Sequence, residues 1–379
     1  MAFSGRHNCK RQFMHKNQLY ELIFFVTSRC NSNCRHCFNR SNLNNNLADL
    51  SLEKINDLAG DLPAIDNLLL SGGEPFLRPD LAELIKIFRA NNNIKTVSIP
   101  TNGLLTDSIV DECAKILAIE GLRSVSVNLS LDGLAKTHDQ IRGVKGNFEK
   151  VLNTLKELKK LKEKNSKLNI LINSVIVKDN YQELFNLFEY LENESAISNH
   201  FFEIMRPELK SAASDKPQDH FISKSFYSRA LSLQYGKFKI DLKTKNFIKR
   251  FLHEVNFLGK MALIYNLQLS NFNNNKVWPF FCQAGKNILV MNCDGRVRPC
   301  ELRDKTFSLS ENFKNKKLVV NSELERELES IKKQKCYCTH FCFIDASINA
   351  SLYARYFLIP FFGLLNYIKY EYFGYRPNL

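Results

Sequence analysis

The feature that most constrains the fold is an alternation of β-rich runs and helix-like stretches from residue 22 to about residue 207. In the helix-like stretches, apolar residues such as Phe148, Val151, Leu155 and Leu158 recur at helical spacing. Strands that alternate with helices favour a parallel α/β sheet that is curved or barrel-like, with its active site at the carboxyl ends of the strands. The six β-rich runs are Leu22–Ser28, Asn67–Gly73, Thr96–Asn102, Ser124–Asp132, Asn169–Val177 and His200–Arg206.

The rest of the chain divides by composition. We expect residues 1–20 to be an N-terminal extension and residues 21–207 to form a partial (β/α)6 barrel. Residues 208–280 are basic and predict a linker with one or two helices. Residues 281–345 predict a small cysteine-rich domain, and residues 346–379 an aromatic, amphipathic tail.

Charge and cysteine content limit the class of protein. The formal net charge is +14, which indicates either an anionic partner or a lysine-rich solvated surface. The N-terminus lacks an apolar run of signal-peptide length, so we expect a cytoplasmic protein. Eight of the eleven cysteines fall into two groups, and in a reducing compartment clustered cysteines are more often metal ligands than disulfides.

The first group is Cys30-x3-Cys34-x2-Cys37, directly after the first predicted strand. Three thiolates within eight residues suit three corners of a [4Fe–4S] cubane and leave one iron open to another ligand. The alternative from spacing alone is a zinc site with its fourth ligand elsewhere.

The stretch TSRCNSNCRHCF, with Phe38 after the third cysteine, resembles the signature of the radical S-adenosylmethionine (SAM) family. The resemblance implies a partial barrel of βα units and an open iron that binds the amino and carboxylate groups of SAM. It further implies reductive cleavage of SAM to a 5′-deoxyadenosyl radical, which abstracts hydrogen from a substrate.

Further motifs follow in the order that this family has. Ser71-Gly72-Gly73-Glu74-Pro75 ends the second predicted strand and resembles the family's GGEP motif, which holds the methionyl amino group. Pro100-Thr101-Asn102-Gly103 ends the third strand, and Ser130-Leu131-Asp132-Gly133 ends the fourth. The hydroxyl of Ser130 and the carboxylate of Asp132 are expected on one side of the strand, where they suit a ribose diol.

The pattern His138-x3-Arg142 then implies an arginine near the SAM carboxylate, although a surface cation is the alternative. The resemblance covers residues 22 to about 206. The expected SAM contacts are Phe38, Gly72, Gly73, Glu74, Pro75, Asn102, Ser130, Asp132 and Arg142.

The second group resembles the auxiliary-cluster extensions called SPASM and twitch. Asp294-Gly295 predicts a hairpin turn, and Gly295-x4-Cys300 matches the extension's pattern. The later Cys-x-Cys-x3-Cys departs from the full SPASM pattern and leaves too few ligands for two clusters, so we expect one [4Fe–4S] cluster. The expected ligands are Cys282, Cys300, Cys342 and one of Cys336 or Cys338, with Cys338 preferred and Cys293 in reserve.

Glu301 follows Cys300, and in some relatives an acidic residue there acts as a base toward a substrate radical. An exposed acid beside Arg303 is the alternative. In the tail, the apolar run from Tyr356 to Leu365 is too short to span a bilayer. It predicts either a helix packed on the barrel or peripheral contact with the inner face of the membrane.

Together these features predict a radical SAM enzyme that contains SAM, a SAM-binding [4Fe–4S] cluster and one auxiliary cluster. The substrate classes that remain open are a peptide and a sugar, glycan or lipid intermediate, and a flavodoxin or ferredoxin is the expected reductant. A zinc-stabilised, basic nucleic-acid-binding protein is the alternative from another class. It leaves the GGEP and SLDG motifs unexplained, so nucleic acid is not the expected partner.

Overall fold

The computed structural model describes residues 18–373 except 46–47, 193, 207–221, 223, 242–245, 273–277, 315, 319–321 and 334–335. Its centre is a sheet with the strand order β6-β5-β4-β3-β2-β1-β7-β8. The six predicted strands are confirmed as β1 (Gln18–Thr27), β2 (Ala64–Gly72), β3 (Thr96–Thr101), β4 (Ser124–Ser130), β5 (Leu168–Ile176) and β6 (Ile197–Ile204). All neighbouring pairs among them are parallel, so their carboxyl ends meet at one edge.

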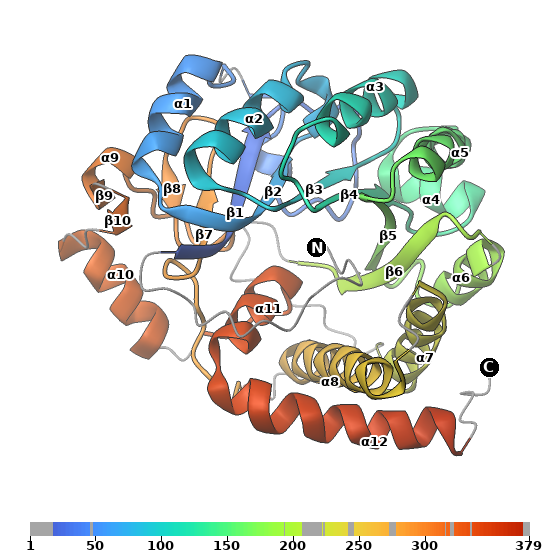
Figure 1. Ribbon diagram of the computed structural model, residues 1–379. Coiled ribbons are helices and arrows are strands. Elements are labelled where there is room, and N and C mark those ends of the chain that lie inside the picture. The colour runs from blue at the N-terminus through green and yellow to red at the C-terminus, as the bar shows by residue number, and fades with distance from the viewer. Residues whose placement is uncertain are drawn as a thin grey trace.

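Helices cover the outer face of this sheet (Figure 1). They are α1 (Leu52–Asp61), α2 (Leu81–Asn92), α3 (Thr106–Leu117), α4 (Ala135–Arg142), α5 (Asn147–Lys164) and α6 (Leu184–Glu192). In α5 the predicted apolar face is buried at Phe148, Val151, Leu155 and Leu158, because these side chains recur every three or four residues toward the sheet. The order of strands and helices confirms the α/β fold with a partial (β/α)6 barrel.

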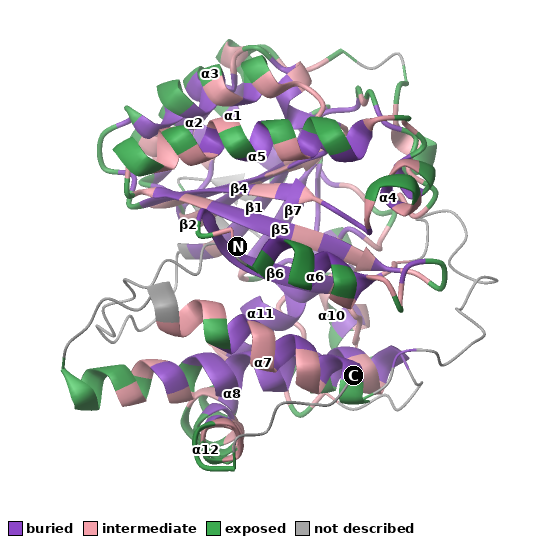
Figure 2. Cartoon of the chain, turned by 90° about the vertical axis from the view of Figure 1, so that its right-hand side faces the viewer, coloured by how far each residue is buried: buried purple, intermediate pink, exposed green. Residues whose placement is uncertain are grey.

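A second helical layer lies across the other face of the sheet, as Figure 2 shows from the side. The region expected to hold one or two helices contains α7 (Lys224–Asp241) and α8 (Phe247–Phe272). Two further helices, α11 (Phe341–Ala350) and α12 (Ile359–Glu371), follow the second cysteine group. The expected N-terminal extension, up to residue 17, and residues 208–221 of the expected linker lie outside the described residues.

The cysteine-rich region contains the predicted hairpin, formed by β7 (Ile288–Met291) and β8 (Val297–Arg298) around Asp294-Gly295. The remaining elements are α9 (Leu309–Asn312), β9 (Phe313–Lys314), β10 (Lys317–Leu318) and α10 (Ser322–Lys333). β7 pairs in parallel with β1, through Glu21 opposite Ile288 to Phe24 opposite Met291. The hairpin therefore extends the barrel sheet, a pairing that the sequence analysis missed because the two strands are far apart in the chain.

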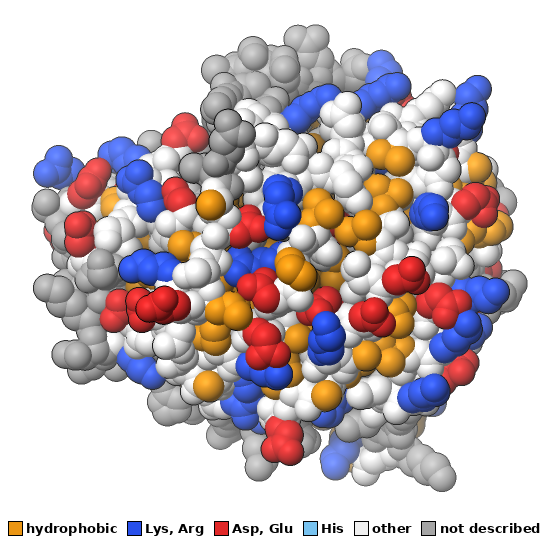
Figure 3. Space-filling view, turned by 90° about the horizontal axis from the view of Figure 1, so that it is seen from above, with side chains coloured by type: hydrophobic (Ala, Val, Ile, Leu, Met, Phe, Trp, Pro, Cys, Tyr) orange, Lys and Arg blue, Asp and Glu red, His pale blue; other side chains and the backbone are white. Residues whose placement is uncertain are grey.

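The surface over the outer helices carries acidic and basic side chains interspersed with one another (Figure 3). The basic excess is thus distributed on this face rather than gathered into one patch. Within the described ranges, no individual helix has both the length and the apolar character needed to cross a membrane. The pair Phe341–Ala350 and Ala354–Glu371 passes that test only when taken together, and the two segments are bent by 93°.

Candidate active site

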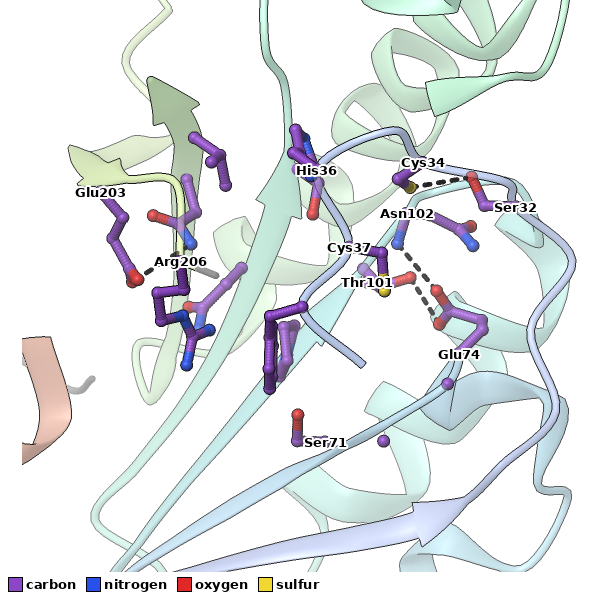
Figure 4. Close-up of a pocket in the computed structure, with 18 of the residues that line it drawn as sticks. Ser32, Cys34, His36, Cys37, Ser71, Glu74, Thr101, Asn102, Glu203 and Arg206 are labelled. Carbon is purple, nitrogen blue, oxygen red and sulfur yellow. Dashed lines mark hydrogen bonds between the residues drawn. The ribbon is translucent and has the colours of Figure 1, made fainter. Parts of the chain in front are cut away.

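A cavity of about 230 Å³ opens at the carboxyl ends of the strands. Its wall includes all three cysteines of the first group together with Glu74 and Arg142, which come from different βα loops. Figure 4 shows Cys34 and Cys37 on the loop after β1, and Glu74 on the loop after β2. The topology therefore brings together motifs that lie more than one hundred residues apart in the sequence.

The loop that bears Cys30, Cys34 and Cys37 is attached to the end of α4 through backbone groups. The amide of Asn33 donates to the carbonyl of Arg142 at 3.0 Å, and the amide of Arg35 donates to the carbonyl of Ile141 at 2.9 Å. The Ser32 hydroxyl also donates to the Arg142 carbonyl, at 3.0 Å. These bonds fix the backbone between the first and third cysteines.

The three thiols are unpaired and half-buried. Burial raises the pKa of Cys30 to about 11, with further repulsion from Glu74 and from the other two thiols. A thiol with so high a pKa must release its proton when it binds a metal, because the thiolate is the ligand. In the part of the chain that the structure describes, no three Cys, His, Asp or Glu side chains converge in a metal-binding arrangement. The fit to a cluster therefore rests on the donor set and its shared cavity wall.

The two glycines of the GGEP motif allow the loop after β2 to touch the start of the cysteine loop. A Cβ on Gly73 would lie 1.9 Å from the carbonyl oxygen of Arg29, and one on Gly72 would lie 2.4 Å from that of Thr27. The amides of Gly73 and Glu74 donate to these same carbonyls, each at 2.8 Å. Glycine is required here because any side chain would push the two loops apart.

Glu74 is buried at the end of this loop and accepts three hydrogen bonds. They come from the hydroxyl of Thr101 at 2.8 Å, the amide of Asn102 at 2.8 Å and the amide of Phe76 at 3.3 Å. Burial raises the pKa of Glu74 to about 7, although these donors oppose the rise. A cationic group in the cavity would stabilise the carboxylate and lower this pKa. The arrangement suits a carboxylate that receives an ammonium ligand.

Asp132 is placed differently from the expectation that it serves a ribose beside Ser130. Ser130 lines the cavity, whereas the carboxylate of Asp132 is fully buried behind the cysteine loop. Its Oδ2 lies 2.6 Å from Nε of Arg142 and 2.9 Å from Nε2 of His36, and its Oδ1 accepts from the amide of Val175 at 2.8 Å. Burial raises the pKa of this carboxyl, but Arg142 and His36 outweigh burial and hold it well below its usual range.

Arg142 is therefore a buried cation rather than a surface one. Its Nη1 donates to Sγ of Cys34 at 3.7 Å, and its guanidinium lies in the cavity wall. Because Asp132 faces both Arg142 and His36, it positions the cysteine loop from behind. The side chain of Asn102 already has a hydrogen-bond partner within the protein, since its Nδ2 donates to Oδ1 of Asn31 at 2.7 Å.

The roof of the cavity is a charged cluster that sequence reasoning found only in part. Nη1 of Arg206 lies 2.5 Å from Oε2 of Glu301, and Nδ1 of His340 lies 2.9 Å from the same oxygen. The Arg206 guanidinium also lies over the ring of Phe38, 3.8 Å from its centroid. Burial alone would raise the pKa of Glu301, but His340 and Arg206 outweigh burial and lower this pKa to about 2. The ion pair lies at the cavity wall, so Glu301 can position the Arg206 guanidinium there.

Three polar residues of the cavity wall were missed: Asn128 on β4, Asn173 on β5 and Glu203 on β6. Nδ2 of Asn173 donates to Oε1 of Glu203 at 3.4 Å. The sequence contained this signal for Asn128, which lies two residues before Ser130 on the same strand and therefore on the same side. Asn173 lies opposite Ser130 on the neighbouring strand, and only the register of the sheet shows this. They give the inner wall hydrogen-bonding groups for a polar substrate.

The second cysteine group gathers beside β1 and β7, in an apolar cluster with Ile23 and Ile288. Burial raises the pKa of Cys300 to about 12, and the neighbouring thiols of Cys282 and Cys336 contribute. The pKa of Cys338 is raised mainly by burial and, to a smaller extent, by the nearby thiols of Cys282 and Cys300.

Cys342 belongs to the same apolar cluster, but it lines the cavity. Its pKa is raised first by burial and then by the carboxylates of Glu21, Glu301 and Glu203. The structure thus gathers all five expected ligands at one apolar cluster, and Cys342 also lines the cavity. Cys293, the reserve ligand, is buried near Asp49 and Asp294 instead.

Comparison with known proteins supports this interpretation of the site. Residues 24–191 match the family model of the radical SAM superfamily. The AdoMet-dependent heme synthase of Methanosarcina barkeri is 27% identical over 347 residues, which cover 87% of this chain and 90% of that protein. The sporulation killing factor maturation protein SkfB of Bacillus subtilis is 26% identical over 281 residues, which cover 74% and 59%. The solved structure of native anSMEcpe with bound AdoMet and Cp18Cys peptide has a TM-score of 0.51 at 20% identity, covers 90% of this chain and 88% of that chain, and shares the fold.

Proposed function

Since the protein is an enzyme of the radical SAM superfamily, we propose that the cavity binds SAM against a [4Fe–4S] cluster held by Cys30, Cys34 and Cys37. The observation that carries this proposal is the meeting of the three thiols, Glu74 and Arg142 at one cavity. When bound, the cluster and SAM supply a 5′-deoxyadenosyl radical that abstracts hydrogen from the substrate.

The protein's own residues would bind and orient the ligand. Glu74 would accept the ammonium group of SAM, because it is the buried carboxylate that lines the cavity beside the glycine loop. Arg142 would face the SAM carboxylate while Asp132 holds its guanidinium in place. Phe38, packed under Arg206, would close the cavity between SAM and the second cysteine group.

We further propose that the substrate is a peptide. SkfB is by name a maturation protein, and the anSMEcpe structure contains a peptide together with AdoMet. The amide side chains of Asn128 and Asn173 and the carboxylate of Glu203 provide both donors and acceptors, which suits peptide groups. A sugar, glycan or lipid intermediate has no comparable support, and nothing in the site favours the nucleic-acid-binding alternative.

One auxiliary [4Fe–4S] cluster completes the proposal. Cys282, Cys300, Cys336 and Cys338 are its proposed ligands, because Cys282 and Cys300 interact with each other and each of them also interacts with Cys336 and Cys338. We place the enzyme in the cytoplasm, with a flavodoxin or ferredoxin as reductant, because all ten described cysteines are free thiols that a reducing compartment preserves.

The central claim is tested by replacing Cys30, Cys34 and Cys37 with Ala and measuring 5′-deoxyadenosine formation with dithionite under anaerobic conditions. We expect the triple variant to lose SAM cleavage. Cys113→Ala is the matched control, because Cys113 is buried in α3 away from the cavity. Undiminished 5′-deoxyadenosine formation in the triple variant would refute the cluster assignment.

The auxiliary ligand set is tested by iron and sulfide analysis of reconstituted protein. The wild type should hold about eight iron atoms, four for each cubane. Cys336→Ala should lose about half of this iron, whereas Cys342→Ala should retain it. The reverse result would return the fourth ligand to Cys342, and zinc in place of the missing iron would remove the auxiliary cluster.

A further inference from the structure

The C-terminal helix exposes a continuous row of large apolar side chains. A π-helical turn (Ala354–Leu358) leads directly into α12. Tyr353, Phe357, Phe361, Leu365 and Ile368 follow one another at intervals of three or four residues, so they lie on one side of this helical segment. Phe357 and Phe361 are 66% and 59% exposed, which is unusual for phenylalanine in a folded protein.

The opposite side of α12 is fixed to the body of the protein. A Cβ on Gly363 would lie 2.1 Å from the carbonyl of Val255, and one on Gly259 would lie 1.9 Å from that of Ile359. The backbones of α8 and α12 therefore touch, and the helix cannot turn its apolar row inward. Figures 1 and 2 show α12 as the outermost helix on the side remote from α1, α2 and α3. The packed helix expected from the sequence and the exposed aromatic face thus occur together.

The beginning of α8 extends the same surface. The rings of Phe251 and Tyr367 lie 5.0 Å apart, which places the start of α8 beside the second half of α12. There α8 exposes Phe247, Ile248 and Leu252. An apolar surface of this extent normally marks an interaction site.

Charge identifies the occupant. From Leu352 to Phe373 the charged residues are Arg355, Lys369 and Glu371, and Glu371 is paired with Lys239 at 2.5 Å. The pKa of Lys369 is lowered mainly by burial and also by repulsion from Lys224, so a second cation lies nearby. The surface is therefore apolar with a positive border. A second copy of the chain would bring these cations together, whereas anionic lipid headgroups would pair with them.

We propose that the exposed side of α12 and the start of α8, here called the docking face, bind the surface of an anionic lipid bilayer. The helix lies in the plane of the interface, with Phe357, Phe361 and Leu365 among the acyl chains and Tyr353 at its border. Insertion of the bent helix pair is excluded, because α11 is buried from Phe341 to Ile348. The first turn of α11 lines the cavity, so one helical segment connects the docking face to the site.

The test is co-sedimentation of the reconstituted full-length protein with vesicles of phosphatidylcholine alone or mixed with phosphatidylglycerol. We expect stronger binding to the mixed vesicles, and salt should weaken this difference by screening. The variant Phe357→Ser/Phe361→Ser/Leu365→Ser should bind about tenfold more weakly for each residue replaced. Its fold should be unchanged, since all three side chains are exposed. Tyr190→Ser, an exposed aromatic of α6, is the matched control and should bind like the wild type.

Failure of the wild type to bind either kind of vesicle would overturn the proposal, as would equal binding by the triple variant. Light scattering measures the oligomeric state and tests the other possible occupant, a second copy of the chain. If the wild type were a dimer and the triple variant a monomer, the docking face would be assigned to a second copy. Iron content is measured on the same samples, so the result is independent of the cluster chemistry.

Discussion

Replacement of Asp132 by Asn tests whether this buried carboxylate holds the cysteine loop. Oδ2 faces two nitrogen atoms, Nε of Arg142 at 2.6 Å and Nε2 of His36 at 2.9 Å. An asparagine can keep the bond from the Val175 amide with its oxygen, but it then turns an N–H group toward the Arg142 guanidinium and the His36 ring. Removing one partner of a buried ion pair costs about 3–5 kcal/mol, because the remaining charge stays buried without compensation. We expect this loss in urea unfolding of the cluster-free protein.

The matched control is an exposed ion pair between the cysteine loop and the loop after β5. Arg35 and Asp179 form an ion pair at 3.7 Å, but both side chains are about two-thirds exposed. Exposed pairs contribute about 0–1 kcal/mol, so Asp179→Asn should leave the unfolding midpoint nearly unchanged. Asp132→Asn should also lower iron incorporation, because Arg142 would no longer orient Cys34. If both variants unfolded at the same urea concentration as the wild type, the positioning role of Asp132 would be refuted.

Two other perturbations address burial and close packing. Burial lowers the pKa of His200 to about 3, whereas an unfolded histidine has a pKa of about 6.5. The unfolded state therefore binds a proton more readily, and the free energy of unfolding falls as the pH is lowered from about 6.5 to about 3. His200→Gln should reduce this acid sensitivity of urea unfolding by up to about 5 kcal/mol, and an identical pH profile would contradict the assignment. Gly73→Ala should lower the free energy of unfolding by about 1–3 kcal/mol or more, because its Cβ would collide with the Arg29 carbonyl. Gly60→Ala is the control, since a Cβ there has nothing within 4 Å, and it should be neutral or slightly stabilising. Thermal unfolding of both variants measures the difference.

The structure also gives Glu301 two partners that the sequence did not indicate. Its position after Cys300 predicts a base, and the structure does place it at the cavity. Two partners distant in sequence, Arg206 and His340, hold it ionised and lower its proton affinity. Local sequence contains no information on such pairing, since the partners lie 95 and 39 residues away, as their numbers show.

The sequence by itself determined the features that depend on neighbouring residues. The strands and the buried side of α5 follow from apolar periodicity, and the three-thiol motif follows from the spacing of Cys30, Cys34 and Cys37. The glycines of GGEP were also recognisable, because a strand that ends on Gly72-Gly73 has to approach another backbone closely.

Only the tertiary structure decided which distant groups meet. It brought Asp132 next to His36 and Arg142, joined β7 to β1, and placed Cys342 of the second cysteine group at the wall of the cavity. It also left one side of α12 exposed while its glycine side packed against α8. These outcomes depend on which side chains become buried and which charged groups pair with one another. Both are determined only when segments distant in the sequence pack together in the fold.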